Sequence, residues 1–324
     1  MTSRTVWTLR RYIDVHAALE DVRLAPFGVL AHADTTHRVV RQSVHQELPP
    51  ALIAQWRATI GARARERLQA LPTDHVLDLV RDFAEPWAQD VTAQLLALSS
   101  AIVASCMPAA RTVFEESAMA TSGAPSALLV QAATELGDRL AGHGGAGLVQ
   151  SFVAMSQTVP ALVGSSLLAL LQHPAQLALL IAQGNADTFA TAANELLRFA
   201  GPSRAVFRTA LAPLALGDVV MSPGDSVVLL LSQANRDSAK FTDPDRLDVE
   251  RPLSGHLALG SGAHGCAGAS LVRMLLVESI AAFVASPRTC ALSDGAAVTW
   301  LDGFALRAPR TVPVIWHRAL TPYP

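Results

Sequence analysis

The sequence predicts a mainly α-helical fold with small β-sheets, and three observations carry that prediction. Across residues 14–201 apolar side chains recur at spacings of three and four, the period of an amphipathic helix. From residue 202 onward the chain changes to short Val- and Leu-rich runs between turn residues, which is typical of strands. Segment 148–172 has no Asp, Glu, Lys or Arg and is long enough to form a central helix. We expect one domain over residues 1–324, helix-rich at 14–201 and mixed at 202–324.

The elements are predicted in chain order from these patterns. Helices are expected at 13–20, 36–47, 50–70, 73–104, 126–142, 148–172, 175–183 and 187–200. Pro86 is expected to interrupt the fourth of these helices, because proline removes a backbone donor. Strands are expected at 204–210, 219–220 and 226–232, a further helix at 267–285, and short extended pieces at 298–316.

Composition excludes several classes of protein. Hydrophobic residues make up 51% of the chain and charged residues 16%, which rules out disorder for most of it. The formal net charge is −2, so no positive excess holds the protein on a phosphate backbone, and nucleic acid is not an expected partner. Three cysteines form no even set at regular spacing, which argues against a disulfide framework and for a reducing compartment.

The first fifteen residues contain no uninterrupted apolar stretch of the kind that a signal peptide needs, so we expect a cytoplasmic protein. Segment 148–172 is long enough to cross a bilayer, but the seven Ser, Thr and Gln side chains between residues 150 and 166 would then need partners in lipid. A buried helix is the better interpretation, and no membrane is expected. The glycine-rich stretch 141–147, AGHGGAG, lacks the Lys and the leading strand of phosphate-binding loops, which favours a helix-to-helix connection.

The strongest chemical signal is Cys266 in LGSGAHGCAGASLVR, residues 259–273. Glycines allow tight turns around this cysteine, a helix begins just after it, and His264 lies nearby. A thiol at a helix N-terminus beside backbone N–H groups is expected to have a lowered pKa and to act as a thiolate. An inert core cysteine is the alternative, and it is the interpretation that we favour for Cys106 and Cys290, which lack this setting.

The segment around Cys266 resembles the haem-binding loop of the cytochromes P450, Phe-x-x-Gly-x-x-x-Cys-x-Gly. Gly262, Cys266 and Gly268 match it, and Leu259 replaces the aromatic residue. The resemblance implies haem b, iron protoporphyrin IX, with Cys266 as its metal ligand. It also implies the cytochrome P450 fold, with the haem between a long distal helix and the helix that follows the cysteine loop.

Two further segments fall in the family's order. Glu195 and Arg198 in ELLR resemble its Glu-x-x-Arg helix, in which the two side chains share one face. FTDPDRLDVERP, residues 241–252, resembles its meander, with Arg251 completing a buried triad. The resemblance implies a structural role for these three residues and no catalytic one.

Haem carries two propionates, which require cations at fixed positions. His37 and Arg41 in THRVVR resemble the family's His-x-x-x-Arg pair, and Arg208 and His264 match two further propionate partners. A surface role is the alternative for His37.

On the distal side AMSQTV, residues 154–159, aligns with the family's oxygen-binding groove. Ala154 keeps the small residue over the iron and Thr158 the hydroxyl that steadies dioxygen. Gln157 occupies the place of the acid and cannot titrate, so it can order a water but cannot relay protons as a carboxylate does. Met155 replaces a glycine, and Pro160 is expected to kink the helix.

The resemblance spans nearly the whole chain, but the chain is short for the family. The segment before residue 8, the loop at 27–36 and the region 111–147 are trimmed. A trimmed lid suits a bulky or carrier-bound substrate, or a partner protein over the open distal face.

The leading functional prediction is an oxygen-dependent hydroxylase of a small organic, secondary-metabolic substrate. The resemblance implies that the thiolate assists O–O cleavage and that a ferredoxin- or flavodoxin-type donor supplies electrons. Two alternatives stay open. One is a peroxide-dependent or redox-neutral haem enzyme, which the missing acid permits; the other is a P450-like helper of a biosynthetic pathway, which the truncation favours and Cys266 disfavours.

Overall fold

A computed structural model describes residues 5–26, 34–47, 49–122, 124–252 and 255–317. The helical elements of the first two thirds run in this order: α1 Tyr12–Glu20, α2 Asp34–Glu47, α3 Pro50–Ala70, η1 Leu79–Ala84, α4 Glu85–Leu95, α5 Ser100–Met119, α6 Ala127–Leu140, α7 Leu148–Val153, η2 Ala154–Thr158, α8 Val159–Gln172, α9 Pro174–Gln183 and α10 Ala186–Ala200. The last third adds α11 Leu231–Ala234, the short 3₁₀ turn η3 Gly262–His264, and α12 Ala269–Val284.

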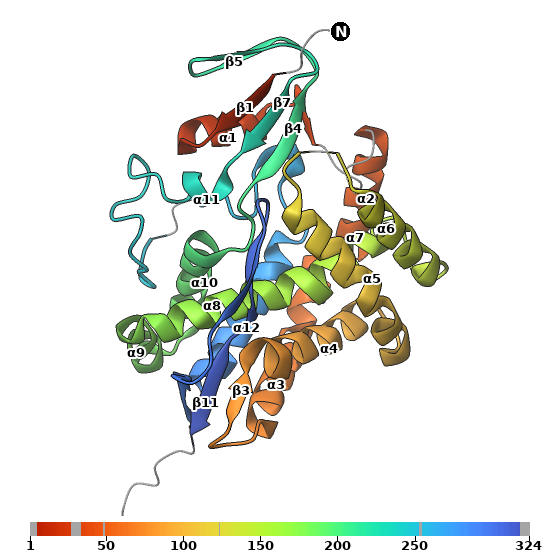
Figure 1. The fold of residues 1–324 in the computed structure, drawn as a ribbon. Coiled ribbons are helices and arrows are strands. Elements are labelled where there is room, and N and C mark those ends of the chain that lie inside the picture. Colours follow the sequence, from red (N-terminus) through yellow and green to blue (C-terminus); the bar gives the residue numbers. More distant parts are fainter. Residues whose placement is uncertain (1–4, 27–33, 48, 123, 253–254, 318–324) are drawn as a thin grey trace, which may run out of the picture.

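The strands are β1 Val6–Leu9, β2 Leu24–Pro26, β3 Val76–Asp78, β4 Val206–Ala210, β5 Leu214–Leu216, β6 Val219–Met221, β7 Ser226–Leu229, β8 Thr289–Leu292, β9 Thr299–Asp302, β10 Arg307–Thr311 and β11 Pro313–His317. Four of them form one sheet in the order β1-β7-β4-β2, in which β1 pairs in parallel with β7. A second sheet has the order β3-β11-β8, and β9–β10 and β5–β6 are antiparallel pairs. The predicted fold class, helices with small sheets, is confirmed (Figure 1).

The prediction of a helix over 73–104 that is interrupted at Pro86 is wrong in its start and in the place of its break. The chain there forms β3, a π-helical turn η1, helix α4 and the start of α5. Pro86 does not end the helix: it lies at the start of α4, directly after the π-helical turn η1, and the π turn accommodates the missing N–H. The break comes instead near Ala97, which has φ +52°, and the Ser99 hydroxyl caps the next helix by accepting from the Ile102 N–H at 3.3 Å. Helix α5 then continues to Met119, beyond the predicted end.

The predicted central helix at 148–172 exists as α7, η2 and α8 in continuous succession. It is the described segment that is long and apolar enough to span a membrane, and 89% of its most apolar window is buried inside the protein. Pro160 lies at the start of α8, directly after the π-helical turn η2. A π turn absorbs the donor that proline lacks, so the expected irregularity at Pro160 takes this form.

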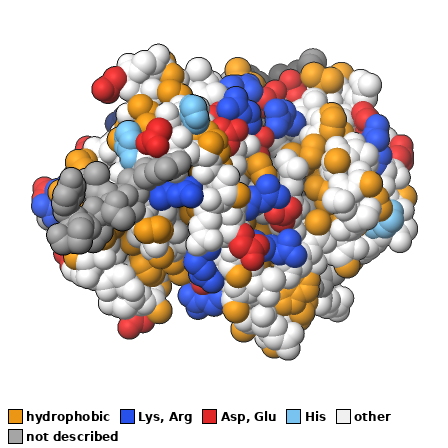
Figure 2. Space-filling view, turned by 90° about the horizontal axis from the view of Figure 1, so that it is seen from below, with side chains coloured by type: hydrophobic (Ala, Val, Ile, Leu, Met, Phe, Trp, Pro, Cys, Tyr) orange, Lys and Arg blue, Asp and Glu red, His pale blue; other side chains and the backbone are white. Residues whose placement is uncertain are grey.

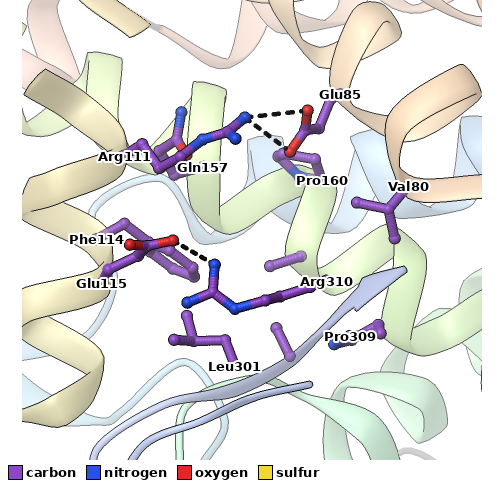
Figure 3. Close-up of a pocket in the computed structure, with 12 residues that line it drawn as sticks. Val80, Glu85, Arg111, Phe114, Glu115, Gln157, Pro160, Leu301, Pro309 and Arg310 are labelled. Carbon is purple, nitrogen blue, oxygen red and sulfur yellow. Dashed lines mark hydrogen bonds and ion pairs between the residues drawn. The ribbon is translucent and has the colours of Figure 1, made fainter. Parts of the chain in front are cut away.

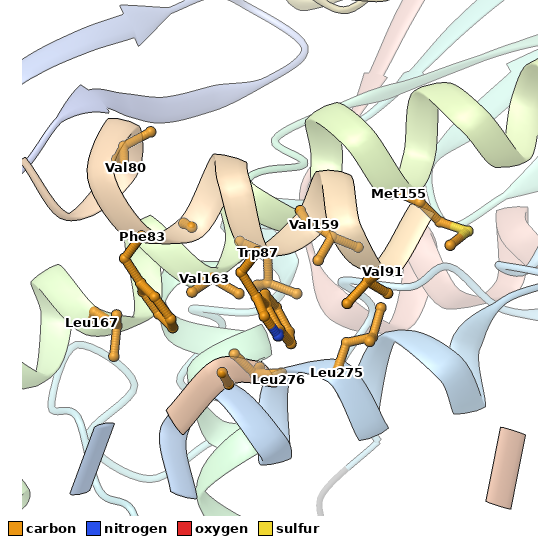
Figure 4. Packing of buried hydrophobic residues seen from close by; sticks show 14 of the residues in the cluster. Val80, Phe83, Trp87, Val91, Met155, Val159, Val163, Leu167, Leu275 and Leu276 are labelled. Atoms are coloured by element: carbon orange, nitrogen blue, oxygen red, sulfur yellow. The ribbon is translucent and has the colours of Figure 1, made fainter. Parts of the chain in front are cut away.

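The main core lies where α4, α8 and α12 meet (Figure 4). Phe83 and Trp87 stack at 6.2 Å between ring centroids and face Val163 of α8 and Leu276 of α12. All four are at most 1% exposed. A second core cluster joins α1 to the four-stranded sheet through residues such as Val15, Leu24 and Val227. Burial of a large apolar side chain contributes about 1.5–3 kcal/mol to stability. The main core therefore holds the central helix against α12.

A buried ion triad ties α10 to the segment that leads to the cysteine loop. Arg198 Nε donates to Glu195 Oε2 at 2.7 Å, and Arg251 Nε donates to Glu195 Oε1 at 3.1 Å. Arg198 also donates to the carbonyls of Asn235 and Pro244. The Glu195 and Arg198 side chains are each 1% exposed, so this triad orders the chain between residues 235 and 251 before it reaches Cys266.

Ion pairs are also scattered over the surface. In the face shown in Figure 2, basic and acidic side chains lie next to one another around apolar patches. Exposed Arg–carboxylate pairs such as Arg81–Asp82 and Arg139–Glu135 occur in the described structure in addition to the buried triad.

Candidate functional site

Cys266 is held in a loop whose shape depends on glycine. Its N–H donates to the Leu259 carbonyl at 2.7 Å, which closes a tight turn. Gly260 and Gly262 have φ of +69° and +66°, a region that other residues rarely adopt. A Cβ on Gly262 would also lie 2.9 Å from the Leu19 carbonyl oxygen. Helix α12 begins at Ala269, three residues after the cysteine, as predicted.

The Cys266 thiol is exposed at the floor of two adjoining cavities between this loop and the central helix. One holds about 790 Å³ of empty space and the other about 890 Å³. Both are lined by Cys266 and His264 below and by Ala154 and Val159 above, so we treat them as one space, the thiol cavity. A planar ligand of several hundred Å³ fits a space of this size between two helices.

The expectation of a lowered pKa for Cys266 is wrong for the ligand-free protein. Although the thiol is open to the thiol cavity, the protein atoms packed around it desolvate it and raise its pKa above its ordinary value. The Gly268 N–H and the charges of Arg41 and Arg273 act in the opposite direction but are outweighed. The helix-terminus argument ignored desolvation, which disfavours the charged thiolate.

Three of the four predicted cationic partners line the thiol cavity. Arg208 on β4 and Arg41 on α2 reach it from different sides, and His264 lies in the cysteine loop. Arg41 donates to the Gly265 carbonyl, which joins α2 to that loop. His37 belongs to α2, but its side chain lies outside the described residues.

Arg208 is the most informative of these cations. Its residue is 6% exposed, its Nη1 donates to the Phe207 carbonyl at 2.9 Å, and its buried Nε has no hydrogen-bond partner. Burial without a counter-charge lowers the pKa of Arg208 to about 10. A buried guanidinium in this state is costly unless an anion joins it.

Comparisons with known proteins agree on one family. The family model described as Cytochrome P450 matches residues 190–284, which hold the ion triad and Cys266. PikC, a cytochrome P450 monooxygenase of Streptomyces venezuelae, is 34% identical over 194 residues, 59% of this chain and 46% of that protein. The vitamin D(3) 25-hydroxylase of Pseudonocardia autotrophica is 28% identical over 313 residues, 83% and 77% of the two chains. The LnmA cytochrome P450 hydroxylase of Streptomyces atroolivaceus superimposes with a TM-score of 0.80 at 26% identity, covering 96% of this chain and 90% of that one.

The chain belongs to the cytochrome P450 family. A structure of P450BioI in complex with a fatty-acyl acyl carrier protein shows the same fold, with a TM-score of 0.84 at 23% identity over 96% of this chain and 92% of that one. The chain spans less than half the length of the first relatives it matches, 46% of PikC and 30% of the biotin-biosynthesis cytochrome P450 of Bacillus subtilis.

The family's cofactor is haem, and the residues of this cytochrome P450 fit it on two observations. The Arg208 guanidinium in the thiol cavity, whose Nε has no hydrogen-bond partner, is the cation that a propionate requires. Gly268 lines the same cavity, and a Cβ there would meet no protein atom within 4 Å. The protein itself therefore leaves open the space beside the thiol that a flat macrocycle needs.

The distal residues divide between two cavities. Ala154 and Thr158 line the thiol cavity, as the resemblance implies. Gln157 instead lines a separate cavity of about 520 Å³ between η1, α4, α5, α8 and β10, which we call the outer cavity (Figure 3). Its Nε2 donates to the Met107 sulfur at 3.7 Å and to the Ser156 hydroxyl at 3.4 Å.

The outer cavity contains two ion pairs that the sequence analysis missed. Arg111 Nη2 lies 3.2 Å from both carboxylate oxygens of Glu85, and Arg310 Nη1 donates to Glu115 at 2.5 Å (Figure 3). Figure 3 shows Arg111 beside the Gln157 side chain. Glu85 and Arg111 lie 26 residues apart on helices whose boundaries were mispredicted, so no local motif could have joined them to Gln157.

Proposed function

We propose that this cytochrome P450 is a monooxygenase that hydroxylates, or similarly oxidises, a small organic molecule. The observation that carries the proposal is that Cys266 and Thr158 line the same cavity from opposite sides. Haem bound there would supply activation of dioxygen by thiolate-ligated iron. The relatives support the reaction class, since PikC is named a monooxygenase and the Pseudonocardia protein a hydroxylase.

Each residue has a distinct task in this proposal. Cys266 is the metal ligand, and Arg208, Arg41, His264 and His37 bind the propionates. Ala154 leaves room above the iron, because any larger side chain there would enter the thiol cavity.

The polar distal residues handle water and protons. Thr158 donates its hydroxyl to oxygen or to an ordered water in the cavity. Gln157 orders water in the outer cavity, on the other side of the π-helical turn η2. Its amide takes no part in proton transfer at neutral pH.

The cavity and the fold support a proposal for the substrate and partners. Met155, Val159 and Leu162 give the thiol cavity apolar walls, which suit a molecule with substantial nonpolar surface. A carrier-bound natural product is our candidate, supported by the carrier-protein complex of P450BioI. We further propose a separate ferredoxin- or flavodoxin-type electron donor, a cytoplasmic location, and a partner protein over the trimmed distal face.

The absorption spectrum of the purified protein tests the proposal, as isolated and when reduced under carbon monoxide. We expect a strongly red-shifted Soret band that is lost in Cys266→Ser, while Cys106→Ser, a buried cysteine outside the cavity, keeps it. Turnover with surrogate electron donors is then compared with turnover with peroxide. A folded protein that binds no haem would overturn the enzyme and favour the helper; turnover with peroxide alone would favour the peroxide-dependent alternative.

A further inference from the structure

A cavity of about 1100 Å³ lies on the other side of residues 201–203 from the thiol cavity. It is bounded by α8, the end of α10, α11 and the β9–β10 hairpin. Four arginines line it, Arg198, Arg204, Arg236 and Arg307, and no Asp or Glu does so among the described residues. We call it the arginine cavity. Four like charges around one space are unusual in a chain with a formal net charge of −2.

The carboxylates that pair with these arginines are too few and too exposed to neutralise their positive charge. Arg204 Nη1 and Arg307 Nε share a single oxygen, Asp302 Oδ1, at 2.7 and 3.3 Å. Arg236 pairs with Asp245 at 2.8 Å. The Asp302 side chain is 58% exposed and that of Asp245 is 85% exposed, so water screens both pairs strongly. Three guanidinium groups therefore share two weakly held counter-charges.

The fourth arginine adds to this imbalance. Arg198 is buried, and its partner Glu195 is already shared with Arg251. Burial is the main cause that lowers the pKa of Arg236, and the positive charge of Arg198 lowers it further. Asp245 and Glu195 act in the opposite direction without restoring the ordinary value, so the positive charge at Arg236 is only partly compensated in the ligand-free protein.

Aromatic rings hold two of the guanidinium groups in place. The Arg236 guanidinium lies 4.0 Å from the Phe199 ring centroid, and that of Arg307 lies 3.6 Å from the Trp300 ring centroid. Arg236 also donates to the Phe199 carbonyl at 3.0 Å. A guanidinium that is already oriented loses less side-chain entropy when it binds a ligand. Both arginines are thus prepared to receive a planar or tetrahedral anion.

We propose that the arginine cavity binds a small molecule that carries a phosphate or pyrophosphate group. Guanidinium groups recognise phosphate oxygens through paired N–H donors, and Ser203 also lines this cavity. The site is separate from the proposed oxidation chemistry, because none of the four arginines lines the thiol cavity. Binding here is therefore independent of whether the proposed function is correct.

Calorimetric titration of the purified protein with inorganic pyrophosphate, at about 0.15 M salt, tests this proposal. We expect saturable binding at one site per chain, weakened at least tenfold in Arg236→Gln and in Arg307→Gln. Arg139→Gln, which removes the same charge from an exposed pair on α6, should bind like the unaltered protein. Arg307→Lys should bind with intermediate strength, since it keeps the charge but loses the paired donors.

Circular dichroism establishes that each variant is folded. If Arg307→Gln does not fold, Arg204→Gln decides, because Arg204 lines the same cavity and shares Asp302 with Arg307. The proposal is overturned if pyrophosphate does not saturate, if Arg139→Gln weakens binding as much as the cavity variants do, or if citrate binds as tightly as pyrophosphate.

Discussion

Gln157 and Thr158 are consecutive residues, yet they line different cavities. Thr158 faces the thiol cavity, and Gln157 faces the outer cavity beside Arg111. The π-helical turn η2 holds both residues, so a single turn of helix is the wall between the two spaces. A proton-exchanging side chain at position 157 would therefore lie one residue from the Thr158 hydroxyl, which faces the thiol cavity.

Replacing Gln157 by Glu, or by Asp, should raise the yield of product per reductant consumed. A carboxylate at this position can carry protons, and the neighbouring Arg111 and its exposed ion pair connect it to water. Product and released hydrogen peroxide are measured together against reductant consumption. Gln157→Met is the matched control and should not raise the yield; an unchanged yield in Gln157→Glu would contradict the account of the missing acid.

Replacing Arg208 by Met should affect the ligand-free and the haem-loaded protein in opposite directions. The variant removes a buried guanidinium with an unpaired Nε, so the melting temperature of the ligand-free protein should rise by the equivalent of about 1–3 kcal/mol. Haem affinity should fall, because a propionate loses its partner. Haem transfer to an acceptor protein and thermal melting measure the two effects. Loss of stability without any change in haem affinity would show that Arg208 has a purely structural role.

Breaking the ion triad should destabilise the fold strongly. Glu195→Gln leaves Arg198 buried without its counter-charge, and we expect a loss of about 3–5 kcal/mol in the free energy of unfolding. The matched control is Glu135→Gln, which breaks an exposed pair with Arg139 at the same loss of charge and should cost about 0.5 kcal/mol or less. Denaturant unfolding measures both. Equal effects would mean that the triad stabilises no more than a surface pair does.

Alkylation of the haem-free protein should single out Cys266 and depend on pH. Cys266 is exposed in the thiol cavity, whereas Cys106 is buried and burial raises the pKa of Cys290 to about 12. The rate at Cys266 should keep rising above pH 9, because its pKa is raised and the thiolate is the reacting form. Bound haem should protect it. Mass spectrometry locates the adduct, and rapid labelling at pH 7 would contradict the raised pKa.

The raised pKa of Cys266 also sets a pH dependence of stability. Since the folded, haem-free protein holds this proton more tightly than the unfolded chain does, the contribution is complete below the unfolded pKa of about 8.5. It is lost as pH rises through the folded value. Cys266→Ala should remove this part of the alkaline loss of stability, as measured by unfolding between pH 7 and 10.

Local signals were read correctly where sequence neighbours determine the structure. The glycines around Cys266 and the three-residue spacing of Glu195 and Arg198 indicated a loop and a paired helix face that the structure contains. Sequence patterns gave wrong predictions where contacts between distant segments determine the structure. The strand β3 exists because β11 pairs with it from more than 230 residues away. The effect of Pro86 could not be predicted because the start of α4 was not known from the sequence.

The direction of the Cys266 pKa shift could not be predicted from the sequence for a similar reason. Its helix terminus is visible in the sequence, but the burial that outweighs it comes from the packing of the whole loop. The outer cavity is a further case, because its two ion pairs join α4, α5 and β10, which no local pattern brings together.

The parallel pairing of β1 with β7 joins segments far apart in the chain and is expected to form late in folding. Val6 is in register with Ser226, so 220 residues must be synthesised before the first strand can find its partner. At about 5–20 residues per second, that takes roughly 10–45 s on a ribosome. During this interval the apolar residues that β1 buries in the sheet stay exposed, and closing so long a loop is intrinsically slow. A polar substitution at Trp7 reduces this exposed apolar surface, so it should lower chaperone dependence in a heterologous host.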